Sequence, residues 1–481
     1  MTTTFGFNFN DTYCKLPEEF IKKSSLYSFE KPKHQIFNSS LADELGLDEA
    51  AIKDKNYIFA NGNELPVGSS PIAQAYCGHQ FGHFVKLGDG RALLLGEHIT
   101  PDKKRFDIQL KGSGPTEFSR GGDGFAALGP MLREYLISES INALGIPTTK
   151  SLSVITTGQP VFRESALKGA MLTRVAQSHI RVGTFQFASL NGKDHVQKLA
   201  DYTIDRHFSD LKNQEQMYEK LLLRVIDLQT ELIARWMTVG FIHGVMNTDN
   251  MSICGETIDY GPCAFMNHFK MDTVFSSIDR NGRYAYSNQP MIAHWNLTRF
   301  AESLLILFDE DVELAKDKAL KILSSFKEKY MHHWLNFMAN KIGIENSSQV
   351  DEEFINEFLR LLEKHHADFT NSFKNLNNPK ILTNSLRSDE SFIQWNNKRI
   401  NLIGKENLGL SQKIMDSINP FVIPRNHLVE RSLESANDGN LDLFYELLHV
   451  TQNPFIMPEK PEYLEPPSQE FDQGYRTFCG T

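Results

Sequence analysis

Short apolar runs separated by polar turns dominate the first 190 residues of the chain. Residues 83–100 hold two apolar runs on either side of Gly88 and Gly90, a pattern that predicts a β-hairpin. Further segments with the composition of strands lie at 106–111, 151–158, 169–176 and 183–190. This part of the chain is therefore predicted to be rich in β-sheet.

Helical periods interrupt and then replace this pattern. One helix is predicted after Gly124, because apolar residues recur at helical spacing until Gly145 and Pro147 end it. A long amphipathic helix is predicted at 218–240, and residues 295–308, 309–343 and 351–373 have the same period. Residues 457–481 are rich in Pro and are expected to lie extended along a surface.

These periods predict an α+β protein in which a sheet-rich part precedes a helical part. We expect four units: an N-terminal extension at 1–65, a sheet-rich lobe at 66–190, a helical lobe at 191–340, and a helical C-terminal extension with a tail at 341–481. A sheet-rich amino-terminal lobe followed by a helical carboxy-terminal lobe is typical of the bilobal protein kinase fold.

Composition excludes several classes of function. The 481 residues carry a net charge of −10, so the chain lacks the global basic character of a nucleic-acid-binding protein. No apolar run reaches about 18 residues, so no membrane span is expected. The first residues resemble neither a signal peptide nor a transit peptide, and the five cysteines form no CxxC pair. A cytoplasmic monomer is the expectation.

The first candidate for chemistry is the order of a glycine turn, a strand lysine and a helix glutamate. Gly88, Gly90 and Arg91 could bring backbone N–H groups and a positive charge to phosphates, although such a turn alone is more often only a turn. Lys111 ends a predicted strand and Glu134 lies on the predicted helix. Each alone would be a solvated side chain, but together they match the lysine–glutamate pair that kinases aim at nucleotide phosphates.

Two further groups of residues could contact an anion. Asp123 and Gly124 stand in a glycine-rich loop, which suits either a ligand site or a plain helix entry capped by Asp123. Arg174 and Arg181 lie in or beside apolar segments, where a buried guanidinium needs a partner. A phosphate would serve as that partner, and so would a structural ion pair.

The stretch HGVMNTDNMSICGETIDYG, residues 243–261, is similar to the catalytic loop and metal-binding segment of kinases. Asn250 and Asp259 offer the oxygen ligands that Mg²⁺ or Mn²⁺ prefers. Val245 stands where kinases have their catalytic Asp, which argues against transfer of the γ-phosphate. Asp249 is the nearest carboxylate and could act as a base, a metal ligand or a turn residue.

Long blocks of the chain resemble the selenoprotein O family, whose members look like pseudokinases. The blocks are LKGSGPTEFSRGGDGFAALGPMLREYL, LTRVAQSHIRVGTFQF and HGVMNTDNMSICGETIDYGPCAFM, and the similarity runs from AYCGHQFGHF to the last Cys. The resemblance implies a protein adenylyltransferase of the bacterial type, with Cys in place of selenocysteine. Such an enzyme binds ATP in a flipped orientation and transfers AMP to Ser, Thr or Tyr hydroxyls of proteins.

The resemblance also implies roles for individual residues. Asp249 would be the base, Lys111 and Glu134 an ion pair, and Asn250 and Asp259 the ligands of Mg²⁺ or Mn²⁺. The nucleotide would be held by Gly88, Gly90, Arg91, Lys111, Asp123, Gly124, Arg174, Arg181 and Asp259. Cys479 is the redox candidate, since relatives pair this position with a Cys after the Asp-Tyr-Gly. Residues 271–290 contain no Cys here, and Cys263 and Cys254 are the nearby thiols.

Three other functions stay open on sequence alone. Transfer of UMP from UTP with Mn²⁺ would use the same residues, because no base-reading residue can be identified. Ordinary phosphoryl transfer conflicts with Val245. A non-catalytic nucleotide-binding scaffold would have little need of metal ligands.

Overall fold

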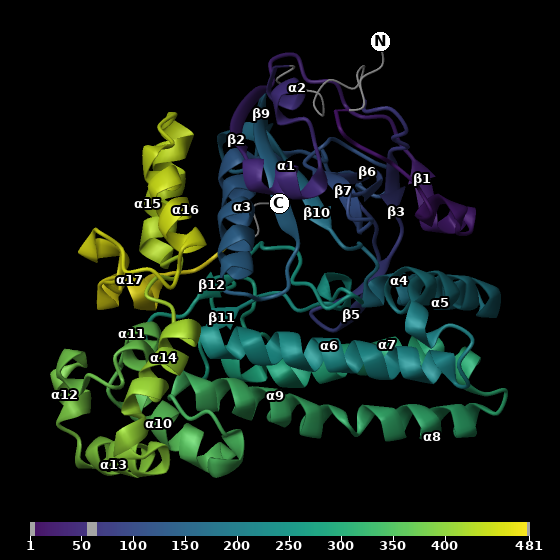
Figure 1. Cartoon of the computed structure of the whole chain (residues 1–481). Helices are drawn as coiled ribbons and strands as arrows, with labels where there is room; N and C mark the ends of the chain where they lie inside the picture. Colours follow the sequence, from purple (N-terminus) through teal and green to yellow (C-terminus); the bar gives the residue numbers. More distant parts are fainter. Residues whose placement is uncertain (1–4, 55–64, 479–481) are drawn as a thin grey trace.

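The computed structural model describes residues 5–54 and 65–478, which form an antiparallel sheet beside a large block of helices (Figure 1). In the described residues the main sheet has eight strands: β1 Ile21–Lys23, β2 Lys33–Phe37, β3 Ile72–Gln74, β6 Ala92–Ile99, β7 Arg105–Lys111, β8 Ala126–Ala127, β9 Lys150–Phe162 and β10 Ala166–Ala176. Their order is β1-β3-β6-β7-β10-β9-β2, with β8 paired to β10. The α+β prediction is confirmed, whereas the kinase-like arrangement of two lobes stays a prediction.

Alternation along the strands explains the two faces of the sheet. Val154 of β9 and Leu172 of β10 belong to the core shared with helix α3 (Leu128–Ala143). Ile155 and Met171, each next to one of them in sequence, belong to the core on the opposite face. Successive side chains of a strand point to opposite sides, so both faces of these strands are buried.

The N-terminal residues cover the second face. Helices α1 (Ser39–Leu45) and α2 (Glu49–Asp54) follow β2, and Leu41 and Leu45 of α1 are buried in the core with Leu110 of β7. Because β1 and β2 also form the two edges of the sheet, the segment predicted as an extension completes the sheet-rich part.

Helix α3 is buried on more than one side. Leu132 and Leu136 contact the sheet core, which also contains Leu433 of α15 (Asn426–Asp438) and Phe444 of α16 (Asp442–Gln452). Figure 1 shows α15 and α16 beside α3, so residues near the end of the chain return to the sheet-rich part. The predicted helix after Gly124 is confirmed.

Two short two-stranded ribbons lie outside the main sheet. Strand β4 (Cys77–Gln80) pairs with β5 (His83–Lys86), and β11 (Phe241–Ile242) pairs with β12 (Ala264–Phe265). The predicted hairpin at residues 83–100 is therefore wrong. Its first apolar run forms β5, which pairs with the preceding strand β4. Its second run forms β6, which pairs with β7 in the main sheet.

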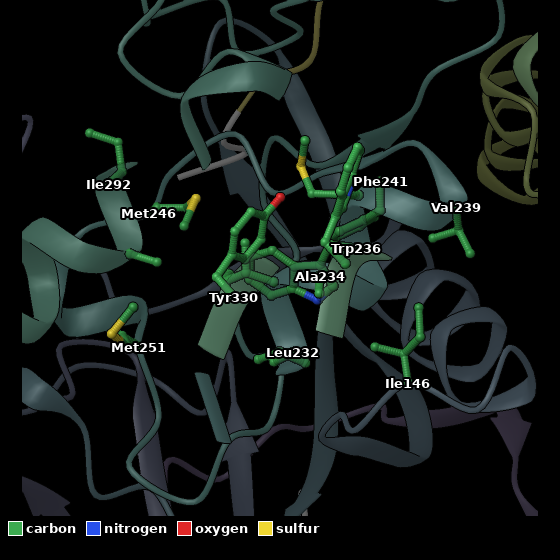
Figure 2. Close-up of a cluster of buried hydrophobic side chains, with 14 of the residues drawn as sticks. Ile146, Leu232, Ala234, Trp236, Val239, Phe241, Met246, Met251, Ile292 and Tyr330 are labelled. Atoms are coloured by element: carbon green, nitrogen blue, oxygen red, sulfur yellow. The ribbon is translucent and has the colours of Figure 1, made fainter. Parts of the chain in front are cut away.

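The helical block contains most of the remaining chain. Its helices are α4 Val182–Leu190, α5 Lys193–His207, α6 Met217–Val239, α7 Gln289–Phe308, α8 Val312–Leu323, α9 Phe326–Lys341, α10 Glu352–Lys364, α11 Phe369–Lys374, α12 Asn384–Arg387, α13 Glu390–Ile403 and α14 Leu408–Ile418. The long helix predicted at 218–240 is confirmed, and it ends where Gly240 adopts a left-handed φ of 70°. Figure 2 shows part of its core, where Trp236 and Phe241 have ring centroids 5.4 Å apart.

The strand predicted at 183–190 is wrong, because this segment is helix α4. Its apolar residues alternate like those of a strand, but Val182, Phe185 and Ala188 lie at helical spacing and are buried against the helical block. Among the described residues no helix is both long and apolar enough to cross a membrane.

The tail was expected to be extended, yet it includes helix α17 (Gln469–Gly474). The Ser468 side chain caps this helix by accepting a hydrogen bond from the Phe471 N–H. Beyond it, the Thr477 N–H donates to the Phe275 carbonyl over 2.8 Å. Asp472 accepts from His268 Nδ1 over 2.7 Å, so the tail is fixed to the segment that follows residue 261.

This contact should make tail docking depend on pH. The hydrogen bond to Asp472 raises the pKa of His268 above 6.5, so its stabilisation is complete below that pH and is lost as the pH rises through the raised value. Burial alone would raise the pKa of Asp472, but hydrogen bonds from His268 and Asn267 lower it below 3.8. The stabilisation that Asp472 contributes is therefore lost only in acid. Docking should therefore be weaker at about pH 8 than at about pH 6.

Hydrogen exchange of residues 469–478, corrected for the intrinsic effect of pH, measures this docking. A His268→Gln variant serves as the control and should lose the difference between the two pH values. Equal protection at both values in the unmodified chain would contradict the prediction.

Candidate functional site

Side chains from the sheet, from α3 and from the loop at 243–261 meet at one point. Lys111 Nζ, at the end of β7, donates to Glu134 Oε2 over 2.6 Å and to Asp259 Oδ1 over 2.9 Å. Lys111 and Glu134 are both buried. The structure thus brings together the lysine and glutamate singled out by their order in the sequence.

Both candidate arginines reach the same carboxylate. Arg174 of β10 donates to Asp259 Oδ1 over 2.6 Å, and Arg181, which precedes α4, donates to Asp259 Oδ2 over 2.8 Å. Gln109 accepts two hydrogen bonds from Arg174, and the Tyr76 ring lies 4.7 Å from the Arg181 guanidinium. The partners fix the direction of both guanidinium groups.

Strand register explains why these side chains converge. Arg174 lies opposite Gln109, and Leu172 lies opposite Lys111, in the antiparallel pairing of β10 with β7. Gln109, Lys111 and Arg174 therefore share the face of the sheet that Leu172 turns toward α3. Glu134 of α3 faces them.

The three neighbouring cations keep the carboxyl group of Asp259 ionised. Burial alone would raise its pKa, but the positive charges of Arg174, Lys111 and Arg181 hold the pKa well below its usual range. Its backbone has a φ of 65°, a left-handed conformation that is uncommon outside glycine and recurs at functional sites. Three cations around a hollow of about 230 Å³ can bind an anion with several oxygens.

Asp249 has a different environment in the same hollow. It lies in a short 3₁₀ turn at Thr248–Asn250 and is buried, and its Oδ1 has no hydrogen-bond partner in the described structure. Burial raises the pKa of Asp249 to about 6, although the charge of Arg181 acts in the opposite direction. This side chain is placed to accept a proton or to contact a bound group.

The residues present fit a divalent cation that shares its shell with a ligand. The Asn250 Nδ2 group donates to the Val245 carbonyl over 3.0 Å, which leaves the Oδ1 oxygen of this amide to coordinate. Asp249, Asn250 and Asp259 all line the hollow. The described residues hold no group of three or more His, Cys, Asp or Glu that could bind a metal alone, so a cation here would need phosphate or water oxygens as further ligands.

The β4–β5 ribbon belongs to this site, and sequence reasoning assigned it no role. The His79 N–H donates to Thr248 Oγ1 over 2.8 Å, and the Phe81 N–H donates to Asn247 Oδ1 over 3.1 Å. A Cβ at Gly78 would overlap Oδ1 of Asp249, so the strand can lie this close only because it carries glycine. The density of Gly, His and Phe in AYCGHQFGHF was the available signal.

The glycine turn contacts a neighbouring loop. A Cβ at Gly88 or Gly90 would collide with Phe118, and Thr116 Oγ1 donates to the Asp89 carbonyl over 2.6 Å. Arg91 lines the hollow described above and also a second one of about 420 Å³. The contact of Gly88 and Gly90 with phosphates stays a prediction.

Asp123 and Gly124 lie outside both hollows. Asp123 accepts from Arg163 over 2.8 Å, and this ion pair, together with the Phe125 N–H, occupies its carboxylate. The structure does not bring these two residues to Asp259, and their contact with a nucleotide also stays a prediction.

The second hollow lies on the other side of Lys111 and Glu134 and is lined by the tail from Tyr475 to Phe478. The Tyr475 hydroxyl accepts from Arg133 of α3 over 3.2 Å, which fixes the tail there. Cys479 follows at once but lies outside the described residues, so its redox role stays a prediction.

Comparisons with known proteins agree on one family. A model of the family described as "Protein adenylyltransferase SelO" matches residues 4–452. "Protein nucleotidyltransferase YdiU" of Geobacillus kaustophilus is 50% identical over 484 residues and covers 99% of both chains. The proteins of the same description from Alkaliphilus metalliredigens and Halalkalibacterium halodurans are 52% and 51% identical, over 99% and 100% of this chain and 98% and 99% of their own.

The tight contact at Gly78 can be tested by one methyl group. Gly78→Ala should lower the free energy of unfolding by about 1–3 kcal/mol, because the strand and the Asp249 turn must move apart. Thermal unfolding measures the effect. Gly409→Ala in α14 is the control, since a Cβ there meets nothing within 4 Å. Equal melting temperatures for the two variants would contradict the described contact.

Proposed function

This chain belongs to the SelO family of protein adenylyltransferases, and from that premise we propose that it transfers AMP from ATP to Ser, Thr or Tyr hydroxyls of protein substrates. The family membership makes the chain a nucleotidyltransferase, and the donor, the acceptor and the roles of individual residues form the proposal. The separation of a sheet-rich part from a helical block, with the site where they meet, supports a kinase-like bilobal fold.

The observation that carries the proposal is the convergence of Lys111, Arg174 and Arg181 on one carboxylate. Three buried cations need anionic partners: Asp259 pairs with all three, and Glu134 pairs with Lys111 and Arg174 as well. A triphosphate offers the same cations many more oxygens, and guanidinium forks match phosphate oxygens in pairs. We assign the hollow between Arg91, Arg181 and Asp259 to the phosphates of ATP.

Asn250 and Asp259 are the residues that would hold Mg²⁺ or Mn²⁺. When bound, the cation would neutralise phosphate charge beside the residues that already do so. This assignment is supported by the oxygen of Asn250 that its own hydrogen bond leaves available.

Asp249 is assigned as the base. Its side chain lines the hollow, where a carboxylate with one unpartnered oxygen can accept the proton of an incoming hydroxyl. The hydroxyl oxygen then bonds to the α-phosphorus of ATP, and the bond from that phosphorus to the bridging oxygen breaks, so pyrophosphate leaves. Val245 fits this reaction, since the base reaches the hollow from position 249 and position 245 contributes its backbone carbonyl.

The decisive test uses ATP labelled at either the α- or the γ-phosphate, with Mg²⁺ or Mn²⁺ and a protein acceptor. We expect label from the α-position only, and its loss by at least about 10²-fold in Asp259→Asn. Asn is preferred to Ala because it keeps an oxygen toward the three cations while it removes the charge. Label from the γ-position would identify a kinase and overturn the proposal.

The same assay separates the other two functions. Stronger label from α-labelled UTP would make the enzyme a uridylyltransferase with the same site. ATP binding without label from either position would identify a non-catalytic scaffold. The Asp259→Asn variant must keep the melting temperature of the unmodified chain within a few degrees for its loss to count.

Lys111→Ala should lower kcat by about 10²–10³, the usual result of removing one charged contact to the reacting group. Glu134 keeps Arg174 as a partner at 3.4 Å, so the variant should stay folded. Lys104→Ala is the matched control, because this lysine lies just before the other end of β7 and pairs with Asp102 in solvent. A loss of less than about threefold in Lys111→Ala would show that the lysine does not contact the phosphates.

A further inference from the structure

Next to the proposed base lies an aromatic and cationic surface that the transfer reaction does not use. Trp295 of α7 is half-buried, and the guanidinium carbons of Arg283 and Arg299 lie 4.8 Å and 5.1 Å from the centre of its ring. The ring of His79 meets Trp295 edge-on at 5.1 Å. Two cations thus share one indole, in a chain whose net charge is −10.

The positive charge of this surface is only partly compensated. Arg283 forms no ion pair with any residue that the structure describes, because the nearby Asp279 carboxylate accepts the backbone N–H groups of Arg283 and Tyr284 instead. Arg299 pairs with Glu302 over 2.7 Å, but that glutamate lies one turn along the same helix and is about half exposed. Exposed pairs of this kind contribute little binding energy.

The contact with the indole leaves the arginine donors available. A guanidinium that lies over an aromatic ring uses its face, while its N–H groups point outward in its own plane. The Nε atoms of Arg283 and Arg299 are buried and have no hydrogen-bond partner among the described residues, so an acceptor would reach these arginines through their terminal N–H groups. Two exposed apolar side chains lie near the indole: the Phe84 ring contacts the His79 ring, and Met291 lies one helical turn before Trp295.

Hydrogen bonds tie this surface to the catalytic loop. The Tyr284 hydroxyl donates to Asn247 Oδ1 over 2.6 Å, and the same oxygen accepts from the Phe81 N–H. Asn247 lines the hollow together with Asp249. His79 follows Gly78, the residue against which the Asp249 carboxylate packs. A segment that contacts Arg283 therefore lies beside the point where its own hydroxyl would meet the base.

We propose that Arg283, Arg299 and Trp295 form the docking surface for the acceptor protein and select hydroxyls that have Asp, Glu or another anionic residue nearby in the sequence. This inference rests on the proposed function, since it names the class of acceptor for the same site. The arginines bind the carboxylates of the acceptor, and Phe84 and Met291 contact its apolar side chains.

The test uses three synthetic peptides that share one central Tyr and differ only in their flanking residues, which are Glu, Gln or Lys. Initial rates with α-labelled ATP give KM and kcat for each. The unmodified enzyme should have the lowest KM for the Glu peptide. Arg283→Ala should raise that KM about tenfold, as expected for losing one hydrogen-bonded charge pair. Its KM for the Gln peptide and its Kd for ATP should not change.

Two further variants keep the result interpretable. Arg280→Ala is the matched control, because this arginine is exposed in the same loop and should leave all three peptides unaffected. Arg283→Glu should reverse the preference and favour the Lys peptide, an effect that misfolding cannot produce. A second charge-reversed variant, Arg299→Glu, should act in the same direction.

The outcomes separate this inference from the function on which it rests. If the unmodified enzyme incorporates no α-label into any peptide or into itself, the proposed function fails. If it labels the three peptides with equal KM, or if Arg283→Ala raises KM equally for all of them, the function stands and the docking surface is refuted.

Discussion

One carboxylate, that of Asp259, is the counter-ion on which the arrangement of this protein depends. Lys111 and Arg174 reach it from the sheet, and Arg181 reaches it from the start of the helical block. A buried charge that loses its partner costs several kcal/mol. If the two parts of the molecule separated at this point, Arg181 would lose its ion pair, and Lys111 and Arg174 would share Glu134 alone. The same contacts hold the guanidinium groups of Arg174 and Arg181 at the lining of the hollow.

Helix α3 supplies further polar contacts around this site. It presents Glu134 to the sheet, and Arg133, the preceding residue, donates to the Cys263 carbonyl over 2.6 Å. A helix with charged residues turned inward on two sides is stable only if each finds a partner and the rest is covered by apolar contacts. Helices α15 and α16 supply that cover from the end of the chain. The end of the chain thus helps to hold α3, and with it Glu134, in position.

The sequence allowed the prediction of features that depend on local period and on the order of motifs. Helices α3 and α6 followed from apolar spacing, and Lys111, Glu134 and Asp259 from the order of their motifs. Features set by distant partners could not be predicted. Residues 183–190 alternate like a strand, yet they form a helix because the helical block buries the residues that lie at helical spacing. The ribbon β4–β5 gave no sign of its contact with the Asp249 turn, which depends on the absence of one side chain at Gly78.

Asp249 and Asp259 stand in the same loop region but in opposite surroundings, and this contrast suits them to different tasks. Each oxygen of Asp259 accepts from a cation in this structure, so a bound Mg²⁺ or Mn²⁺ would have to share this carboxylate with the cationic side chains. Asp249 lies against a strand, and its Oδ1 has no hydrogen-bond partner among the described residues, which suits the base that we propose. Under the proposed function the two roles could not be exchanged, since cations around Asp249 would lower its pKa and the sheet would lose its counter-ion. Position 245 then needs no charged side chain, and the backbone carbonyl of Val245 orients Asn250 by accepting a hydrogen bond from its amide.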